Sequence, residues 1–392
     1  MARNFQSLLR TTLNVFNKSI TQNICVSGTR TLYAATVLGL DSYQKQRENV
    51  EQQFLSMSDK FREKMVSFVD GESKNMVFTE DLKNMLHLAN DNPTDLELLS
   101  KMLIKFNKQN KELRFGSFVF GPVVMRTYYY LDKTDEALAA FNNPELEGFF
   151  NQVVSCQILM DLLYNHGRYA EIRQVFDTIE SKNILGTSFP KDVIVLVFAA
   201  CYKENSTESF EYALNCYQKL KMRGNHLVRR AATFFAGLAL KQGRPEITAE
   251  VMFNEKQFNY VSVRLLKVAA LSDLDRLDDV LPILRNSLSN DRISQIKHLY
   301  PIEVLDKVEK AIERAQLDKN DPMVTVVRQL KSNDHIEPKT LDDVLCMTII
   351  GRIKDQGQYK TPANFRTRAY NPSERTRRPY NEYQRTGLKD LV

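Results

Sequence analysis

Arginine and aromatic side chains alternate near the C-terminus, in a pattern that suits contact with a nucleic acid. The aromatic members are Tyr359, Phe365, Tyr370, Tyr380 and Tyr383, and the arginines are Arg366, Arg368, Arg375, Arg377, Arg378 and Arg385. Arginine neutralises phosphates, and aromatic rings stack on single-stranded bases at roughly 1–3 kcal/mol per base. Prolines in the run forbid a long helix. We expect a disordered basic tail over residues 354–392 that binds RNA through Arg375, Arg377 and Arg378; a solvated tail without a partner is the alternative.

A second basic pair, Arg229-Arg230, stands beside the predicted start of a helix in the middle of the chain. Two adjacent guanidinium groups at a helix start can contact the phosphates of a strand that enters a groove. The alternative is that both side chains belong to a solvated helix face.

No arrangement of side chains in the sequence indicates catalysis. A glycine-rich phosphate loop, a serine nucleophile elbow and a helical His-Glu metal pair are all missing from the sequence, and its five histidines are far apart. The five cysteines include no C-x-x-C pair, so neither a disulfide framework nor a zinc knuckle is indicated. We expect a protein that is not an enzyme, needs no cofactor and works in a reducing, non-secretory compartment.

Two short segments look alike. Leu277-Asp278-Asp279-Val280 and Leu341-Asp342-Asp343-Val344 both place paired acids where a helix is predicted to begin. Acids in the first turn interact favourably with the helix dipole, which explains the pairs. A metal site is the alternative.

The net charge of +6 is unevenly spread. Residues 1–40 contain four basic residues and no acid, and residues 354–392 contain nine basic and four acidic residues, which leaves −3 for residues 41–353. A basic groove in the folded body must therefore be local, because the global charge does not provide one.

The first forty residues match the description of a mitochondrial transit peptide. Phe5, Leu8, Leu9, Leu13 and Phe16 recur at helical spacing among basic residues, Ser and Thr, without an acid. We expect residues 1–35 to be a transit peptide, cut near Arg30–Tyr33, and the protein to be located in the matrix. An amphipathic surface or membrane-surface helix is the alternative. No run of 18 apolar residues predicts a membrane span.

The central part of the chain repeats a helical hairpin. Apolar residues recur at helical spacing between five turns, which we place at Asp132-Lys133, Gly167-Arg168, Thr207, Gly243-Arg244 and Asp275-Arg276. The intervals between them are 35, 40, 36 and 32 residues. Such a recurring two-helix unit predicts a solenoid, in which each hairpin buries its apolar face against its neighbours.

Two of these hairpins resemble a pentatricopeptide repeat. The likeness is carried by Val153–Met160, Asn165–Arg168, Val175–Ile179, Pro190–Ile194 and Ala213–Gly224. The tetratricopeptide pattern needs a Trp and a Leu-Gly pair in the first helix, and neither is present. The resemblance implies an all-α fold, a right-handed α-solenoid of helix-turn-helix repeats with helical caps at both ends.

The resemblance also implies single-stranded RNA as the ligand, with one or two side chains of each repeat reading a base. The family reads with the fifth residue of the first helix and the last residue of the motif. These positions fall on Pro122, Gln157, Val197 and Thr233, and on Gln152, Asp192 and Val228. Gln157, Asp192 and Thr233 can bond to a base edge, whereas Pro122 and Val197 cannot. A solvated helix face is the alternative for Gln157 and Thr233.

Further helices are expected on both sides of the array. The pattern predicts a long helix from Val50 to Phe68 that ends near Gly71, a second from Glu80 to Ala89, and a third that Thr94 caps and that runs from Asp95 to about Phe106. Beyond the array we expect a capping helix over 296–312, kinked or started at Pro301, and shorter helices over 323–330 and 341–350. The expected parts are 1–35, 41–117 (N-terminal helical region), 118–290 (repeat array), 291–353 (C-terminal cap) and 354–392.

Three functions are compatible with this sequence. The first is an RNA-binding protein of the mitochondrial matrix that acts in transcript processing, maturation or stability. The second is a protein-binding scaffold associated with the mitochondrial ribosome or an RNA-processing complex, which the few polar reading residues and the slightly acidic body favour. The third is an RNA-processing enzyme, which the missing catalytic motifs disfavour.

Overall fold

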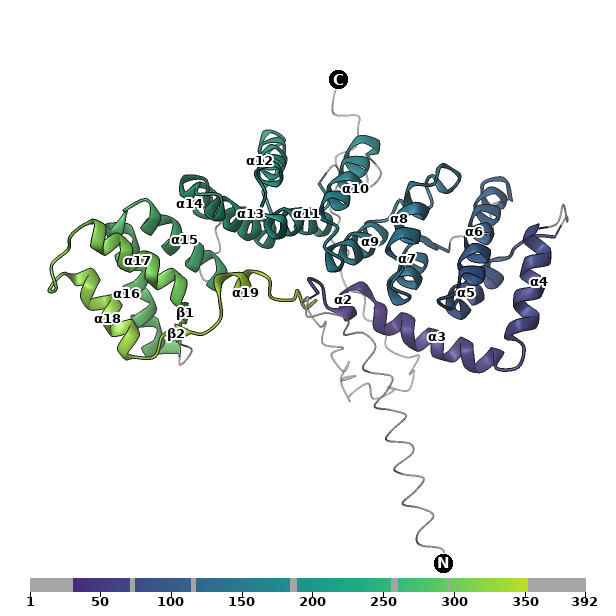
Figure 1. The fold of residues 1–392 in the computed structure, drawn as a ribbon, viewed down its shortest axis with the longest axis horizontal. Helices are drawn as coiled ribbons and strands as arrows, with labels where there is room; N and C mark the ends of the chain where they lie inside the picture. Colours follow the sequence, from purple (N-terminus) through teal and green to yellow (C-terminus); the bar gives the residue numbers. More distant parts are fainter. Residues whose placement is uncertain are drawn as a thin grey trace, which may run out of the picture. The chain divides into compact units, whose positions relative to one another are not determined.

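The computed structural model describes residues 31–70, 75–113, 118–183, 189–254, 260–294 and 297–351, with the backbone alone over 290–294. Within these ranges the chain is almost entirely helical, and its helices follow one another in sequence order (Figure 1). The predicted all-α class is therefore confirmed, and the arrangement is that of a helical-repeat solenoid.

Five helical hairpins form the array. They pair α7 (Gly121–Tyr130) with α8 (Thr134–Asn142), α9 (Val153–Asn165) with α10 (Tyr169–Lys182), α11 (Lys191–Glu204) with α12 (Thr207–Met222), α13 (Arg229–Lys241) with α14 (Pro245–Asn254), and α15 (Val261–Asp273) with α16 (Leu277–Ser294). The five predicted turns are found, the third of them at Asn205–Ser206 and not at Thr207, which already begins α12. Each contains a residue with left-handed φ, at Asp132, Gly167, Asn205, Gly243 and Asp275, which reverses the chain after the first helix.

The hairpins pack in two rows. The inner row consists of α7, α9, α11, α13 and α15, each of which contacts the next inner helix. The outer row consists of α8, α10, α12, α14 and α16, and its helices α8, α10, α12 and α14 each contact the inner helix that follows (Figure 1). This stacking of neighbour on neighbour buries one continuous apolar core along most of the array.

Between residue 31 and the array the structure describes five helices: α2 (Ala35–Leu38), α3 (Leu40–Phe54), α4 (Ser58–Asp70), α5 (Thr79–Leu88) and α6 (Pro93–Leu113). The prediction of one long helix over 50–68 is wrong, because the chain breaks between Phe54 and Ser58. The two halves differ in their main partners: α3 packs on α5 and α7, whereas α4 packs mainly on α6 and also contacts α5. Tertiary contacts therefore divide an apolar pattern that is continuous in the sequence.

The start of α6 also differs from the prediction. The helix begins at Pro93 rather than Asp95, and Asn92 caps it in place of Thr94, since Asn92 Oδ1 accepts a 2.6 Å hydrogen bond from the backbone N–H of Asp95. Proline in the first turn lacks an N–H that would need a partner there, so it begins the helix instead of preceding it.

The C-terminal part contains α17 (Ile302–Arg314), α18 (Pro322–Ser332) and α19 (Leu341–Leu345). Helix α17 begins directly after Pro301, so of the two predicted alternatives the capping helix starts at this proline and is not kinked by it. The preceding Tyr300–Pro301 (β1) instead pairs in parallel with Ile336–Glu337 (β2), with Tyr300 opposite Ile336. The helix predicted over 341–350 ends at Leu345, because the residues after it pair with the N-terminal end of the described chain.

Candidate nucleic-acid interface

Four inner helices are buried around their whole circumference. The buried runs are 155–164 in α9, 193–202 in α11, 231–239 in α13 and 262–272 in α15. Outer helices such as α12 keep one exposed side. A helix that is apolar all round must be covered on every side. The second helix of each hairpin covers only one side of the inner row, so other parts of the chain cover the opposite side.

Two segments provide this cover. We name residues 341–351 the strap and residues 31–40 the N-terminal segment. The strap contacts α13 and α15 through α19, and the N-terminal segment contacts α9 through α2, both on the side of the inner row away from the outer helices (Figure 1). The surface that this pair covers, on α9, α11, α13 and α15, is the inner face.

The strap and the N-terminal segment are joined by backbone hydrogen bonds. The N–H of Ala34 donates to Ile349 O at 3.1 Å, and the N–H of Ile349 donates to Leu32 O at 2.8 Å, so that Tyr33 and Ile349 form a parallel bridge. The hydroxyl of Thr348 adds a 3.0 Å bond to the carbonyl of Thr31. Residues more than 300 positions apart thus close over the inner face as one layer.

Asp342 ties the strap to two consecutive hairpins. Its carboxylate lies 2.7 Å from the Nζ of Lys203, at the end of α11, and 3.2 Å from the Nζ of Lys241, at the end of α13. Burial alone would raise the pKa of Asp342, but its hydrogen bonds to Lys203 and Tyr202 and the charge of Lys241 outweigh that effect and leave the pKa lowered. Asp342 is therefore ionised at neutral pH and bridges the two lysines.

Arg230 holds the backbone of the strap. Its Nη1 donates to Leu345 O at 3.1 Å, and its Nη2 donates to Met347 O. Gly237 leaves the space into which Leu345 packs, because a Cβ at Gly237 would lie 2.8 Å from Leu345 Cδ1. A charge-assisted contact and an apolar contact on one helix, α13, thus fix the strap.

Arg126 on α7 holds the backbone of the N-terminal segment in the same way. Its Nε donates to Leu38 O at 2.7 Å, and burial lowers its pKa. The turn that follows α2 depends on Gly39, which has φ +71°, and a Cβ there would lie 2.9 Å from Arg126 Nη2. Cations of α7, α11 and α13 therefore all bind acceptor oxygens of the two covering segments.

Asp161 of α9 lies fully buried beneath the N-terminal segment. Its Oδ1 accepts from the backbone N–H of Tyr33 at 3.3 Å, and its Oδ2 accepts from the Tyr129 hydroxyl at 3.0 Å. The Tyr33 hydroxyl in turn donates to the backbone carbonyl of Asp192 at 3.1 Å. Tyr33 thus connects α9 to the start of α11.

The residues predicted to read RNA differ in accessibility. Gln157 is only 6% exposed and Thr233 is fully buried, with its hydroxyl bonded to Arg230 O at 2.9 Å, so neither lies on a solvated helix face. The Asp192 side chain is exposed, but it lies inside the first turn of α11, whereas Gln152 and Val228 immediately precede their helices. Arg375, Arg377 and Arg378 lie outside the described residues.

Arg229, which is half-buried, forms a cation–π pair with an exposed residue that sequence reasoning missed. Its guanidinium lies 3.6 Å from the ring centroid of Tyr260, and Tyr260 is 43% exposed. Arg229 begins α13 and Tyr260 immediately precedes α15, so the pair joins the N-terminal ends of two inner helices. The available signal was an aromatic residue directly before the apolar run that leads to the predicted turn at Asp275-Arg276.

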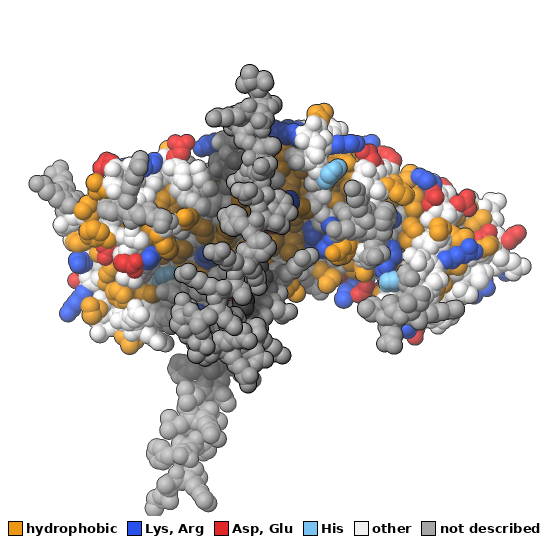
Figure 2. Space-filling view, turned by 180° about the vertical axis from the view of Figure 1, so that it is seen from behind, with side chains coloured by type: hydrophobic (Ala, Val, Ile, Leu, Met, Phe, Trp, Pro, Cys, Tyr) orange, Lys and Arg blue, Asp and Glu red, His pale blue; other side chains and the backbone are white. Residues whose placement is uncertain are grey.

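Charge on the surface is otherwise mixed. Figure 2 shows lysine and arginine interspersed with aspartate and glutamate, with hydrophobic side chains between them, over the part of that face not covered by grey atoms. Among the described residues no group of acidic, histidine or cysteine side chains could hold a metal ion, so the acid pairs give no sign of a metal site there. None of the described helices has the length and apolar character needed to cross a membrane.

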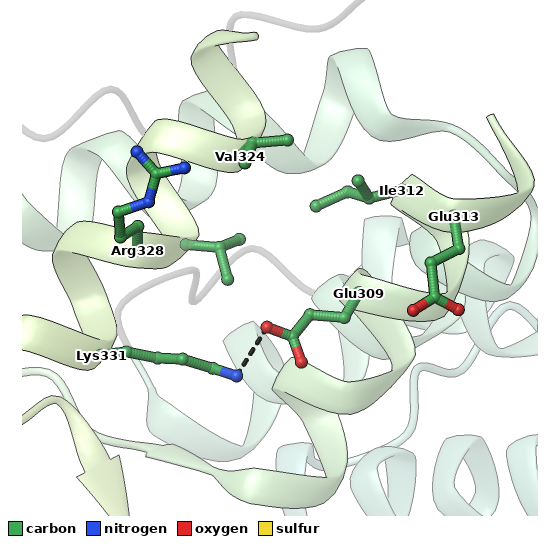
Figure 3. A pocket seen from close by; sticks show the side chains of 7 residues that line it. Glu309, Ile312, Glu313, Val324, Arg328 and Lys331 are labelled. Carbon is green, nitrogen blue, oxygen red and sulfur yellow. Dashed lines mark ion pairs between the residues drawn. The ribbon is translucent and has the colours of Figure 1, made fainter. Parts of the chain in front are cut away.

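A pocket of about 420 Å³ lies between α17 and α18, away from the inner face. Ile312, Val324 and Val327 line it together with Glu309, Glu313, Arg328 and Lys331, and Glu309 pairs with Lys331 Nζ at 2.5 Å (Figure 3). Its walls carry charges of both signs, with Glu309 and Glu313 beside Arg328 and Lys331, so it does not match a phosphate-binding site.

These features define a helical-repeat protein whose inner row of helices is covered by two segments of the same chain. No protein-family model matches the chain. Relatives named "Pentatricopeptide repeat-containing protein 2, mitochondrial" do match: the Homo sapiens protein is 30% identical over 278 residues, covering 70% of this chain and 69% of the relative. The Xenopus laevis protein is 28% identical over 324 residues, covering 81% and 82%.

The chain belongs to the family of pentatricopeptide repeat-containing protein 2, whose matched members are named mitochondrial. The predicted pentatricopeptide repeat family is thereby confirmed. Phe120–Arg126, Tyr128–Tyr130 and Asp135–Leu138, at the start of the array, also suggest a narrower likeness to the first repeat of this particular protein, and the matched relatives bear it out.

Proposed function

We propose that the protein binds single-stranded RNA along its inner row and acts in the processing, maturation or stability of transcripts in the mitochondrial matrix. It works without catalysis of its own, by holding a strand and exposing or protecting a processing site. Membership of the pentatricopeptide repeat family supports an RNA ligand, and the names of the relatives support the organelle.

One observation carries the proposal: inner-row cations hold the two covering segments by their oxygen atoms. Arg126 binds the Leu38 carbonyl, Arg230 binds two strap carbonyls, and Lys203 binds the Asp342 carboxylate. Single-stranded RNA also presents oxygen acceptors, at regular intervals along its backbone, and basic side chains bind them in the same way.

The Arg229–Tyr260 pair provides a contact that the covering segments leave open. An exposed tyrosine ring can stack on an unpaired base of any identity, while the guanidinium beside it contacts a phosphate. The pair fits RNA recognition by stacking and backbone contact. This mode does not need the base-by-base code, for which Pro122 and Val197 are unsuited.

The test is fluorescence anisotropy of the full chain with single-stranded RNA oligonucleotides tiled across mitochondrial transcripts. We expect Tyr260→Ala to weaken binding about 5-fold to 150-fold, which corresponds to roughly 1–3 kcal/mol for one stacked base. Arg229→Met should reduce the slope of log affinity against log salt by about 1, since one phosphate contact is lost.

Arg244→Met is the matched control, because Arg244 lies at an exposed turn before the outer helix α14 and pairs with Glu246. Its affinity should equal that of the wild type. Equal affinity of all four proteins, or no binding by any, would contradict the proposal.

A second candidate is a protein-binding scaffold at the mitochondrial ribosome or in an RNA-processing complex. It is favoured by the strap itself, since the inner face already holds a peptide that packs Val344, Leu345 and Cys346 out of solvent. Co-sedimentation with mitochondrial ribosomes that survives nuclease treatment would select this candidate over RNA binding.

A further inference from the structure

We propose that the strap is a displaceable cover that regulates the inner face, so that the strap and RNA compete for the same cations. This inference rests on the proposed RNA binding and adds its regulation. In the closed state seen here, strap residues 341–351 occupy the ends of α11 and α13. In the open state Lys203, Arg230 and Lys241 are free to bind a strand.

The closed contacts resemble those of a bound phosphate backbone. The Asp342 carboxylate is one anion between lysines of two consecutive inner helices, at 2.7 Å and 3.2 Å. A phosphate in the same place would make the same two ion pairs. The carbonyls that accept from Arg230 are neutral, so an RNA strand would replace them with acceptors of greater charge.

The strap is attached over a short length only. Its helix α19 has five residues, and the chain after Cys346 is extended. Met347 is 54% exposed and Ile350 is 72% exposed, so Val344, Leu345 and Cys346 are the buried apolar residues of the strap, and Leu341 and Ile349 are partly buried. Segments with few buried apolar contacts open at a lower free energy than the core does.

Strap opening also affects the N-terminal segment. Ile349 bonds to both Ala34 and Leu32, so a strap that leaves takes these partners away from the N-terminal segment. Tyr33 and Arg126 retain their separate contacts with α9 and the Leu38 carbonyl. Opening therefore begins over α11 and α13, where the cations released are Lys203, Arg230 and Lys241.

Cys346 is a natural reporter of strap position. It is 7% exposed, and burial raises the pKa of its thiol, so a maleimide reacts with it slowly while the strap is closed. Cys156, Cys201 and Cys216 are buried within α9, α11 and α12 and do not move with the strap. Cys25 lies outside the described residues and is replaced by serine in every protein tested.

The experiment compares Asp342→Asn with Asp278→Asn. Asp278 occupies the same place as Asp342 in the matching tetrapeptide Leu277–Val280, but its side chain is exposed and lies at the start of α16. Maleimide labelling of Cys346 is followed with and without RNA, and RNA affinity is measured by anisotropy. Leu345→Ala serves as a second strap variant, and circular dichroism checks that each protein is folded.

We expect Asp342→Asn and Leu345→Ala to speed labelling of Cys346 about tenfold and to tighten RNA binding, with Asp278→Asn like the wild type. RNA should also speed labelling of the wild type. If RNA binds all proteins equally and leaves labelling unchanged, the strap is a fixed part of the fold and the proposed regulation is wrong while RNA binding stands. If no protein binds RNA, the proposed function fails, and the regulation fails with it.

Discussion

The backbone N–H of Tyr33 donates to Oδ1 of Asp161 at 3.3 Å, across 128 positions of sequence. Asp161 is fully buried, and its bonding partners among the described residues, Tyr33, Tyr129 and Asn165, are neutral. Burial raises the pKa of Asp161 to about 7, although these hydrogen bonds act in the opposite direction. The contact therefore makes the attachment of the N-terminal segment sensitive to pH.

Replacing Asp161 by asparagine should remove this pH dependence. The folded protein binds a proton at Asp161 more tightly than the unfolded chain, where the pKa of aspartate is about 3.9. The free energy of unfolding thus falls as pH rises between these two values, and the loss is complete above about 7. We expect the melting temperature of the wild type to fall relative to that of Asp161→Asn between about pH 5 and about pH 8. Asp278→Asn is the reference variant. Equal changes of melting temperature with pH in the wild type and in Asp161→Asn would contradict the prediction.

The contacts of the N-terminal segment bear on where the predicted transit peptide would be removed. Leu32 is 1% exposed and Tyr33 is 4% exposed, and both contribute backbone contacts to Ile349 or Asp161. We predict that the mature chain begins at Leu32 or earlier, and N-terminal sequencing of protein from mitochondria measures this. A recombinant chain that begins at Ala34 should show faster labelling of Cys346 than one that begins at Thr31. A mature N-terminus at Ala34 or beyond would show that the segment is dispensable.

Gly237 should be intolerant of a methyl group. A Cβ there would lie 2.8 Å from Leu345 Cδ1 and 2.9 Å from Tyr202 Cε2. We expect Gly237→Ala to destabilise the protein by about 1–3 kcal/mol, as overpacked cores do, measured by urea unfolding. Adding Leu345→Ala removes one of the two clashes, so the double variant should lose less stability than the sum of the two single changes. Strict additivity would mean that Leu345 does not pack against Gly237 in solution.

Arg229 and Arg230 should have separable roles although they are adjacent. Arg230 donates to two strap carbonyls, whereas Arg229 lies over Tyr260. Hydrogen bonds to charged groups contribute about 1.5–3 kcal/mol, so Arg230→Met should speed labelling of Cys346 by about tenfold or more. Arg229→Met is the matched control and should leave labelling unchanged while it weakens RNA binding. Equal labelling of the two variants would show that Arg230 does not hold the strap.

Local signals explain why the array could be predicted. Each of the five turns contains a residue that reverses the chain, such as Gly167 or Gly243, and the helices between them carry apolar residues at helical spacing. The run Val193–Tyr202 contains no charged residue and is buried throughout, which the sequence also indicates. These features depend only on neighbouring residues, so pattern reasoning finds them.

The inner face could not be predicted in the same way. The segments that cover it are residues 31–40 and 341–351. Their pairing, for example of Ile349 with Leu32, leaves no periodic pattern in the sequence. Sequence reasoning placed Gln157 and Thr233 on an accessible face because the family reads bases there. In the structure Gln157 is buried, and Thr233 is buried with its hydroxyl bonded to the Arg230 carbonyl of its own helix. Arg230 and Asp342 were noticed for their charge, but their partners lie more than 100 positions away.

The most direct test of RNA binding by the inner row is to map where RNA contacts the protein. Ultraviolet crosslinking in isolated mitochondria, followed by mass spectrometry of the crosslinked peptides, gives this map. We predict discrete mitochondrial transcripts crosslinked to peptides that contain Tyr260 or the start of α13. The absence of crosslinked transcripts, or crosslinks confined to outer helices such as α10 and α12, would contradict it.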